Sequence, residues 1–315
     1  MVQNLRIVFV MDRPHAIDIS ADTTFALALE AQRRGHSLYY ANPALVGSEG
    51  GDPVAVIQEM QVTREEEPHV LLGEEKRVKL DASSDVVWQR KDPPVDAEYI
   101  YSTQILALCR RSLVLNRPSG ILAANEKLYT LNFPDLMPDT IVSSSSVELL
   151  RFLDGLGGEM IIKPLDGRGG EGIFVLRRGD VNLFSLIEQA TNFGERLAMA
   201  QEYLPAISQG DKRILLIDGE PLGAVLRVPA PGESRANLHV GGSAAAGILD
   251  DSDKRIIRAV GSRLRKDGLF LVGIDVIGGK LTEINVTSPT GIQEMIRIDG
   301  VNYSSSVIEA VEAKK

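Results

Sequence analysis

The chain has 315 residues, of which 44% are hydrophobic and 24% are charged, and its formal net charge is −9 at pH 7. A chain of this length can bury a large core and is expected to divide into two or three domains. The acidic balance argues against a nucleic-acid groove or an anionic membrane surface as a binding partner. No apolar run reaches the length of a membrane span, and the first residues lack the layout of a signal peptide, so we expect a soluble globular protein.

The few cysteine and histidine residues exclude some chemistry. Cys109 is the single cysteine and lies in an apolar stretch that is expected to be helical. A core thiol is favoured over a nucleophile, because free cysteine is among the most buried residue types. One cysteine forms no intramolecular disulfide, which fits a reducing cytoplasm. The four histidines are scattered along the chain and give no sign of a zinc site.

The first third of the chain alternates strand-like and helix-like patterns. Strands are expected at residues 5–11, 37–42, 86–88 and 113–118, and helices at residues 23–34, with Asp22 as N-cap, and 96–111. Such alternation predicts a Rossmann-like parallel sheet with helices on its faces. Residues 53–80 are polar and alternating, so they are better interpreted as an edge hairpin pair than as a helix.

A basic pair follows the third of these strands. In open parallel sheets, ligands bind beyond the carboxyl ends of the strands. Arg90 and Lys91 come shortly after residues 86–88, so they could face a substrate. A surface basic pair that closes the strand is an equally good interpretation from position alone.

A glycine-rich stretch, residues 167–172, lies between two apolar runs that are typical of strands. Its letters GRGGEG match G-x-G-x-x-G, but a dinucleotide-binding fold requires a helix after the glycines, and the strand-like IFVL follows instead. We therefore predict a β-hairpin whose loop lays backbone N–H groups over phosphates. No glycine run is followed by G-K-[ST], which excludes a Walker P-loop. Lys163 precedes the loop, and a phosphate-neutralising role is favoured for it over a solvent-facing one.

A second domain is expected to start near residue 124, with helical patterns over residues 125–133, which include Lys127, 147–156 and 181–193. The strand-like run that follows ends in Gln201-Glu202-Tyr203-Leu204-Pro205. This segment could form an interdomain hinge, and its backbone could pair with a flat base edge such as that of adenine.

A second hairpin is expected around Asp218-Gly219, and Arg227 ends it. Residues 229–247, which carry Arg235 and Asn237, are poor in large apolar groups and rich in glycine and alanine. We predict a mobile active-site loop there, with a disordered surface loop as the alternative.

Residues 269–291 contain the densest group of candidate ligands. Two apolar runs flank Gly278-Gly279, which predicts a β-hairpin with a tight turn. Asp275 on one strand can then meet Glu283 and Asn285 on the other, because residues two apart share a face. Two carboxylates and an amide are hard oxygen ligands that suit Mg²⁺, although a solvated polar face on a half-buried hairpin is the open alternative. The segment ends in Ser288, Pro289, Thr290 and Gly291, which open a helix whose N-terminal amides could bind a carboxylate.

Together these segments resemble the ATP-grasp superfamily and, over essentially the whole chain, the bacterial glutathione synthetase family. The resemblance is carried by RKDPP at 90–94, NEKL at 125–128, KPLDGRGG at 163–170, YLPAI at 203–207, GDKR at 210–213 and LTEINVTSPTGI at 281–292. One such segment could be coincidence, but six in the family's order are specific.

The resemblance implies ATP-dependent joining of γ-glutamylcysteine to glycine through an acyl phosphate, which gives glutathione, ADP and phosphate. It implies an α/β fold in three parts: an N-terminal pre-ATP-grasp domain (1–123), a lid that carries the glycine loop (124–203) and a C-terminal subdomain with the metal site (204–315). It also implies a cytoplasmic homo-oligomer, a dimer or a tetramer, that binds ATP and two Mg²⁺ ions, for which Mn²⁺ can substitute.

The resemblance also implies roles for matching residues. Contacts with ATP are expected from Lys127, Lys163, Gly167, Gly169, Gly170, Gln201, Glu202, Tyr203, Leu204 and Asp211. The metal ligands would be Asp275, Glu283 and Asn285, with Glu283 bridging two ions. Catalytic roles are expected for Arg213, Arg227 and Arg235. Substrate contacts are expected from Arg90, Arg213, Arg227, Arg235, Asn237, Ser288, Pro289, Thr290 and Gly291.

One departure from the family pattern concerns the predicted mobile loop. Relatives are expected to carry an arginine near GGSAAAG, yet residues 241–247 hold no charge, so loop closure would depend more on Arg235. Another ATP-grasp carboxylate–amine ligase, similar to a D-alanine ligase or a peptide-tail glutamate ligase, shares the lysines and the metal hairpin, and RKDPP with GDKR argues against it. A non-catalytic nucleotide-binding protein would not need every metal ligand, and a protein kinase would need the absent H-R-D loop.

Overall fold

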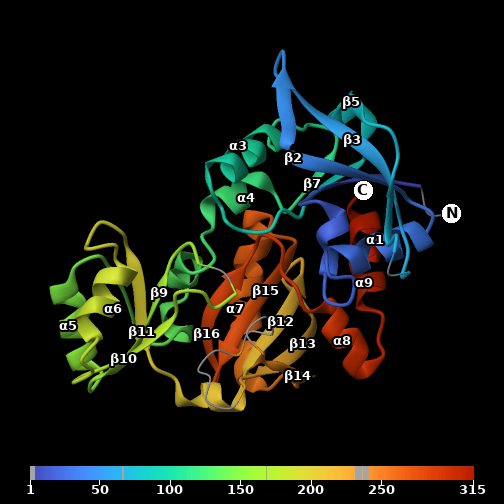
Figure 1. The fold of residues 1–315 in the computed structure, drawn as a ribbon. Helices are drawn as coiled ribbons and strands as arrows, with labels where there is room; N and C mark the ends of the chain where they lie inside the picture. The colour runs from blue at the N-terminus through green and yellow to red at the C-terminus, as the bar shows by residue number, and fades with distance from the viewer. Residues whose placement is uncertain (1–3, 66, 168, 231–235, 237–240) are drawn as a thin grey trace.

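The computed structural model describes residues 4–65, 67–167, 169–230, 236 and 241–315. Along this described part of the chain, three sheets follow one another, one in each of the three predicted parts (Figure 1). The mixed α/β class is therefore confirmed, whereas the exact domain boundaries stay a prediction. No helix within these described ranges combines the length and the apolar character that a membrane crossing would need.

The N-terminal sheet has the strand order β4-β3-β2-β1-β6-β7, with β5 also paired to β3. Its strands are β1 (Arg6–Val10), β2 (Ser37–Glu49), β3 (Asp52–Val62), β4 (Val70–Leu72), β5 (Lys76–Lys79), β6 (Val86–Gln89) and β7 (Leu113–Leu115). β1 is parallel to β2 and β6, and β6 is parallel to β7, whereas β3 pairs antiparallel with β2, β4 and β5. The predicted parallel sheet and its antiparallel edge over residues 53–80 are both confirmed.

The helices of this part are η1 (Pro14–Ala16), α1 (Thr23–Arg33), α2 (Leu80–Ser83), α3 (Ala97–Leu106) and α4 (Pro118–Ala123). Asp22 caps α1 as predicted, because its carboxylate accepts the N–H of Phe25 at 2.6 Å. Thr23 and Phe25 are buried, so the start of α1 is fixed by packing as well as by the cap.

The predicted helix over residues 96–111 is wrong at its C-terminal end, because α3 ends at Leu106. Asp81 accepts the N–H groups of residues 110–112 at 2.8–3.0 Å, so these donors bond a side chain and not helical carbonyls. Cys109 therefore lies beyond the helix, where it packs against an apolar cluster. Cys109 is only partly buried, and this burial raises the pKa of its thiol to about 12, which argues against a nucleophilic thiolate.

The lid sheet has the strand order β10-β9-β11-β8. Its elements are η2 (Leu128–Asn132), η3 (Pro134–Leu136), β8 (Thr140–Ser143), α5 (Ser146–Gly155), β9 (Glu159–Pro164), β10 (Phe174–Arg177), α6 (Leu183–Ala190) and β11 (Ala198–Glu202). β9 and β10 are antiparallel, so the glycine stretch between them is a hairpin loop, as predicted. The buried faces of α5 and α6 pack on this sheet in one apolar cluster.

Two helices predicted in the lid are shorter than expected. The helix predicted over residues 125–133 is the 3₁₀-helix η2, and Lys127 precedes it. The side-chain oxygen of Asn125 accepts the N–H groups of Lys127 and Leu128 at 3.0 Å each, which fixes a turn before the helix. The helix predicted over residues 181–193 ends at Ala190, because Asn192 and Phe193 adopt positive φ.

The C-terminal sheet has the strand order β14-β13-β12-β15-β16 and is antiparallel throughout. Its elements are η4 (Pro205–Gln209), β12 (Asp211–Ile217), β13 (Glu220–Val228), β14 (Ser243–Ala246), α7 (Asp251–Asp267), β15 (Leu271–Ile277), β16 (Lys280–Asn285), α8 (Ile292–Asp299) and α9 (Tyr303–Lys314). Both predicted hairpins are confirmed. The prediction of a loop over residues 229–247 is wrong for Ser243–Ala246, because the backbone of this segment pairs with the edge of β13.

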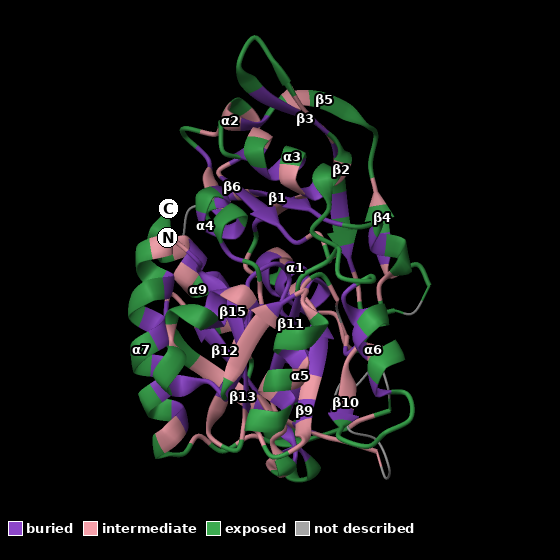
Figure 2. Cartoon of the chain, turned by 90° about the vertical axis from the view of Figure 1, so that its left-hand side faces the viewer, coloured by how far each residue is buried: buried purple, intermediate pink, exposed green. Residues whose placement is uncertain are grey.

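The C-terminal helices return to the N-terminal part of the molecule. Val307, Ile308 and Val311 of α9 share an apolar cluster with Phe25 and Leu27 of α1. Figure 1 shows α9 in red beside α1 in blue, and Figure 2 shows the buried strands lying beneath helices whose outer faces are exposed. The first and last segments of the chain therefore form one packed unit.

Candidate active site

A row of charged side chains crosses the C-terminal sheet from β13 to β16. Strand pairing places Arg227 opposite Asp211, Arg213 opposite Asp275, and Asp275 opposite Glu283. Because residues two apart on a strand share a face, Asp211 and Arg213 of β12 point to the same side of the sheet. The register of four strands thus builds the cluster that we call the charged row.

Short ion pairs join the charged row. Arg213 binds Asp275 through two nitrogens, with Nη2 2.8 Å from Oδ2. Nη2 of Arg227 lies 2.5 Å from Oδ2 of Asp211 and 2.9 Å from Oδ2 of Asp275. All four side chains are buried, so the alternative of a solvated polar face is wrong for Asp275. Nδ2 of Asn285 is 3.3 Å from Oδ2 of Asp275, which brings the predicted ligands together.

The two buried aspartates of the charged row have opposite pKa shifts. Burial raises the pKa of Asp211 to about 6, although Arg227 opposes the shift. Burial also acts on Asp275, but Arg213 and Arg227 outweigh it and hold the pKa of that carboxyl well below its usual range. Oδ1 of Asp211 and Nε of Arg227 are buried and have no hydrogen-bond partner in the described part of the chain. Buried polar atoms are normally paired, so these two have capacity left for a bound molecule or water.

Two lysines lie at the β16 end of the charged row. Nζ of Lys127 is 3.1 Å from Oε1 of Glu283 and donates to the carbonyl oxygen of Gly167 at 2.7 Å. Nζ of Lys163 donates to the carbonyl oxygen of Thr282 at 3.0 Å. Lys163 is buried, and burial lowers its pKa to about 8 while Glu283 opposes the shift. The solvent-facing alternative for Lys163 is therefore wrong.

The glycine loop between β9 and β10 requires glycine at two kinds of position. A Cβ atom at Gly167 would lie 2.8 Å from Cγ of Pro164 and 2.9 Å from the carbonyl oxygen of Glu171, so no side chain fits there. Gly169 and Gly170 adopt φ of +59° and +85°, which other residues rarely accept. The loop begins beside Lys127, and its contact with phosphates stays a prediction.

The residues predicted to bind adenine lie at the end of a lid-sheet strand and in the link that follows it. Gln201 is buried at the end of β11, and its Nε2 donates to Oγ1 of Thr140 at 3.0 Å. Glu202 ends β11, and Tyr203 and Leu204 connect it to η4. The structure therefore places them where the lid sheet leads into the C-terminal sheet, and their contact with a base stays a prediction.

Side chains of the N-terminal part hold the segment of residues 288–291. Arg90 is buried and donates from Nε to Oγ1 of Thr24 at 2.9 Å and from Nη2 to the carbonyl oxygen of Pro289 at 3.2 Å. The surface-pair alternative is therefore wrong for Arg90. The hydroxyl of Ser288 donates to Asp92.

The same segment also touches β12. Nη1 of Arg213 lies 3.4 Å from the carbonyl oxygen of Thr290, and Gly291, with φ of +129°, precedes α8. Residues 288–291 thus bridge the N-terminal sheet and the charged row.

Some residues that the structure places at the site were not predicted from the sequence. Asp92 binds Ser288, and Asn125 donates to the carbonyl oxygen of Leu165 at 3.0 Å. Glu126 accepts three hydrogen bonds from Val286 and Thr287, just past the end of β16. Asp92 lies in RKDPP and the other two in NEKL, so their place inside motifs was the available signal. The predicted residues Arg235 and Asn237 lie outside the described residues.

The predicted metal ligands have suitable donor atoms. Within the described ranges, no group of three or more histidine, cysteine, aspartate or glutamate side chains is arranged to hold a metal. The predicted site instead combines two carboxylates with the amide of Asn285, and hard oxygen donors of this kind fit Mg²⁺. Glu283 is paired with Lys127, and Asp275 with two arginines, so a bound cation would share these carboxylates with basic side chains.

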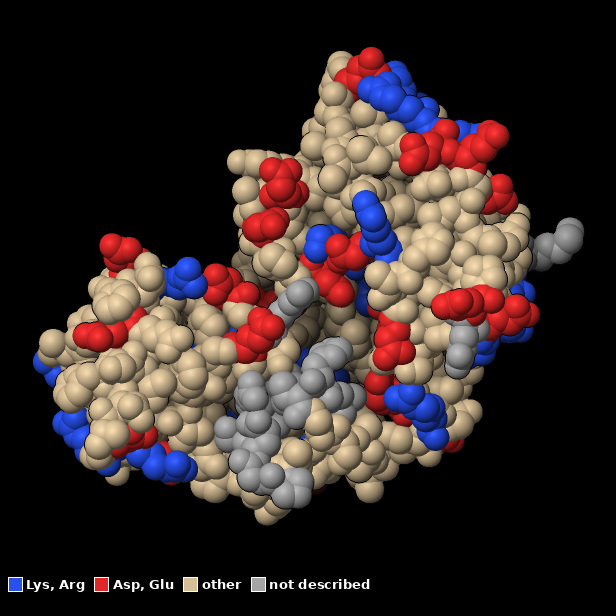
Figure 3. Space-filling model, in the orientation of Figure 1, with Lys and Arg blue, Asp and Glu red and all other residues tan. Residues whose placement is uncertain are grey.

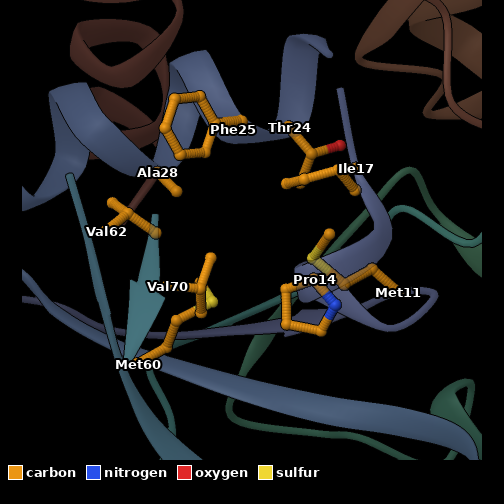
Figure 4. A pocket seen from close by; sticks show the side chains of 9 residues that line it. All are labelled: Met11, Pro14, Ile17, Thr24, Phe25, Ala28, Met60, Val62 and Val70. Carbon is orange, nitrogen blue, oxygen red and sulfur yellow. The ribbon is translucent and has the colours of Figure 1, made fainter. Parts of the chain in front are cut away.

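Two hollows can be compared on the molecule. Figure 3 shows the surface hollowed between the lid and the rest of the molecule, with acidic and basic side chains gathered along it. The second hollow lies between α1 and β3, and Figure 4 shows that its lining is apolar apart from Thr24. Because a triphosphate needs cations and N–H donors, the first hollow is the candidate active site.

The comparisons with known proteins agree with this geometry. Residues 5–121 match the family model of the prokaryotic glutathione synthetase N-terminal domain, and residues 126–300 match that of the prokaryotic glutathione synthetase ATP-grasp domain. The glutathione synthetase of Mesorhizobium japonicum is 45% identical and that of Synechococcus elongatus is 43% identical, and each alignment covers at least 98% of both chains. The ATP-grasp RimK domain protein of Sphaerobacter thermophilus has the same fold, with a TM-score of 0.64 at 15% identity over 97% of this chain and 98% of that one. The chain therefore belongs to the prokaryotic glutathione synthetase family and carries its ATP-grasp domain.

Proposed function

We propose that this chain, an ATP-dependent ligase, joins γ-glutamylcysteine to glycine through an acyl phosphate and releases glutathione, ADP and phosphate. The observation that supports this most directly is the charged row, where buried arginines and aspartates lie beside two lysines and the glycine loop. The family membership of the whole chain supports the choice of substrates.

The proposed reaction brings two anions together, because a substrate carboxylate must attack the γ-phosphate of ATP. Arg213 and Arg227 are preorganised by their ion pairs, so little reorganisation is needed when negative charge develops in the transition state. Planar guanidinium groups bind carboxylate and phosphate oxygens in pairs, which a lysine ammonium cannot do. We therefore assign both arginines to the reacting groups, together with Arg235 of the loop.

The triphosphate would be held by the lysines and the lid. Lys127 and Lys163 lie where the glycine loop approaches β16, and the three glycines Gly167, Gly169 and Gly170 carry no side chain that would hinder a phosphate. Asp211 and the segment Gln201–Leu204 would face the nucleoside. Asp275, Glu283 and Asn285 would hold Mg²⁺, two ions in our proposal, or Mn²⁺ in their place. When bound, the metal supplies positive charge that neutralises the phosphate oxygens.

The dipeptide would lie between the N-terminal sheet and the charged row. Arg90 and the segment 288–291 are joined there, and Asn237 would add a contact from the loop. The acyl phosphate reacts with glycine's amine but also with water, so closure of the lid over the hollow would protect it. We further propose a cytoplasmic homo-oligomer, a dimer or a tetramer, without nucleic-acid or membrane partners.

One assay tests the proposed function. Phosphate release is measured with γ-glutamylcysteine, glycine and Mg-ATP, and again with each component omitted in turn. We expect stoichiometric phosphate and glutathione only in the complete mixture. Phosphate release with D-alanine or a peptide carrying a C-terminal glutamate, and none with γ-glutamylcysteine, would instead identify a different ATP-grasp ligase.

A further inference from the structure

Glu126 occupies the open edge of β16. This strand ends the C-terminal sheet, so one side of its backbone faces no neighbouring strand. The carbonyl oxygen of Glu126 accepts the N–H of Ile284 at 2.9 Å. Its side-chain Oε1 accepts the N–H of Val286 at 2.9 Å, the N–H of Thr287 at 3.1 Å and the hydroxyl of Thr287 at 2.9 Å. Glu126 thus pairs with one backbone N–H of β16 and with the two residues just past the end of that strand.

The neighbours of Glu126 bind the glycine loop. On one side, Nδ2 of Asn125 donates to the carbonyl oxygen of Leu165 at 3.0 Å. On the other side, Nζ of Lys127 donates to the carbonyl oxygen of Gly167 at 2.7 Å. Three consecutive residues therefore connect the lid loop to the strand that carries Glu283 and Asn285.

We propose that Glu126 is a positioning residue that fixes β16 relative to the glycine loop, so that Lys127 and the predicted metal ligands stay aligned on the same phosphates. This inference rests on the proposed function. Glu126 itself makes no contact with the reacting groups in this assignment. It acts through Lys127, which follows it in the chain, and through Glu283 and Asn285, which lie next to the residues that it binds.

The chemistry of the contact explains the choice of residue. Three donors converge on one oxygen of Glu126, and removal of that oxygen would leave the backbone N–H groups of Val286 and Thr287, just past β16, unpaired. Glutamine has the same length and also carries an acceptor oxygen at this position. Loss of residues that orient metal ligands usually costs about 10–100-fold in affinity or activity.

The test compares Glu126→Ala and Glu126→Gln with the wild-type chain and with Glu74→Gln, which changes an exposed carboxylate in the N-terminal part. We would measure kcat, the KM for ATP and the affinity for Mg-ADP by calorimetry, each per mole of folded protein, together with Tm. We expect Glu126→Ala to lower kcat/KM for ATP by about a hundredfold and to weaken Mg-ADP binding by about tenfold. For Glu126→Gln and Glu74→Gln, kcat/KM and Mg-ADP affinity should stay within about threefold of the wild type. Glutamine at position 126 keeps an acceptor oxygen for Val286 and Thr287, and the change at position 74 leaves Glu126 untouched.

Two results would overturn the inference. If folded Glu126→Ala kept wild-type kinetics and Mg-ADP affinity while its Tm fell, Glu126 would serve stability alone. If Glu126→Gln were as impaired as Glu126→Ala, the acceptor geometry would not be the cause. Failure of the proposed function can be told apart from failure of this inference, because the wild-type chain would then make no glutathione at all.

Discussion

Two clusters of arginine and carboxylate groups use the same chemistry for different ends. The charged row lies inside the C-terminal sheet, whereas a second cluster joins α1 to α9 and centres on Arg34, which lies 2.6 Å from Oε2 of Glu312 and 3.2 Å from Oε1 of Glu309. Nε2 of His36 lies 2.9 Å from Glu312, so that carboxylate has several partners. We call this second group the α1–α9 cluster.

The clusters differ in whether their polar atoms are satisfied. In the described part of the chain, the charged row keeps a buried oxygen of Asp211 and a buried nitrogen of Arg227 without partners, whereas no buried side-chain atom of Arg34, His36 or Glu312 lacks one. A cluster that is satisfied internally holds two elements together, and one that is not satisfied can take a ligand. Mutations should therefore change activity in the first cluster and stability in the second.

The largest expected effect is that of Glu283→Gln. The side chain of Glu283 is partly exposed and glutamine has nearly the same shape, so the fold should stay intact. We expect turnover below about a thousandth of the wild-type rate, because one anionic ligand of the proposed cation is lost. The measurement is ADP release, with circular dichroism as the check on folding. Near-normal ADP release by this variant would refute the metal assignment.

Arg213→Lys should have the next largest effect. Lysine keeps the charge but cannot bind Asp275 and a substrate oxygen through two parallel nitrogens, so kcat should fall on the order of a hundredfold. The matched variant is Arg34→Lys in the α1–α9 cluster, which should leave kcat unchanged. Equal kcat values for both variants and the wild type would show that Arg213 has a structural role and not a catalytic one.

In the α1–α9 cluster we expect Glu312→Gln to lower the free energy of unfolding by about 1–2 kcal/mol. This lies between the usual value for an exposed ion pair and that for a buried one, because both partners are mostly but not fully buried. The midpoint of thermal unfolding should fall by a few degrees while kcat per folded molecule stays constant. A loss of kcat without a loss of stability would contradict the contrast between the two clusters.

The smallest effect is the pH dependence of that stability difference. The Arg34 guanidinium, with a smaller contribution from His36, holds the pKa of Glu312 below its usual range despite burial. The stabilisation is therefore complete above the unfolded-state pKa of about 4.3 and is lost as the pH falls through the lower folded-state value. The gap between wild type and Glu312→Gln in denaturant unfolding should narrow from about pH 5 to about pH 3. A constant gap would indicate that packing, and not charge, is responsible.

Much of this architecture could be predicted from the sequence, because it depends on local signals. Alternating and continuous apolar runs located most strands, and Asp218-Gly219 and Gly278-Gly279 located both hairpins of the C-terminal sheet. Asp275, Glu283 and Asn285 could be grouped because a hairpin turn fixes which residues face each other. The helix boundaries failed where distant side chains decide them, as Asp81 does beyond the end of α3.

The charged row could be predicted only in part. Its arginines were expected from the family resemblance, but their pairing with Asp211 and Asp275 depends on strand register between segments far apart in the chain. Asp92 and Glu126 were not recognised for the same reason. Their partners, Ser288 and the end of β16, lie more than 150 residues away, and spacing along the chain contains no information about such contacts.

The return of α9 to the N-terminal sheet has a consequence for the order of synthesis. Val307, Ile308 and Val311 cover apolar residues of α1, so one side of this core stays exposed until residues 303–314 have left the ribosome. Many multidomain chains complete their first domain while the rest is still being made. Here the nascent chain would carry an uncovered apolar face of α1 until α9 has been made, and deletion of residues 303–314 would expose that face.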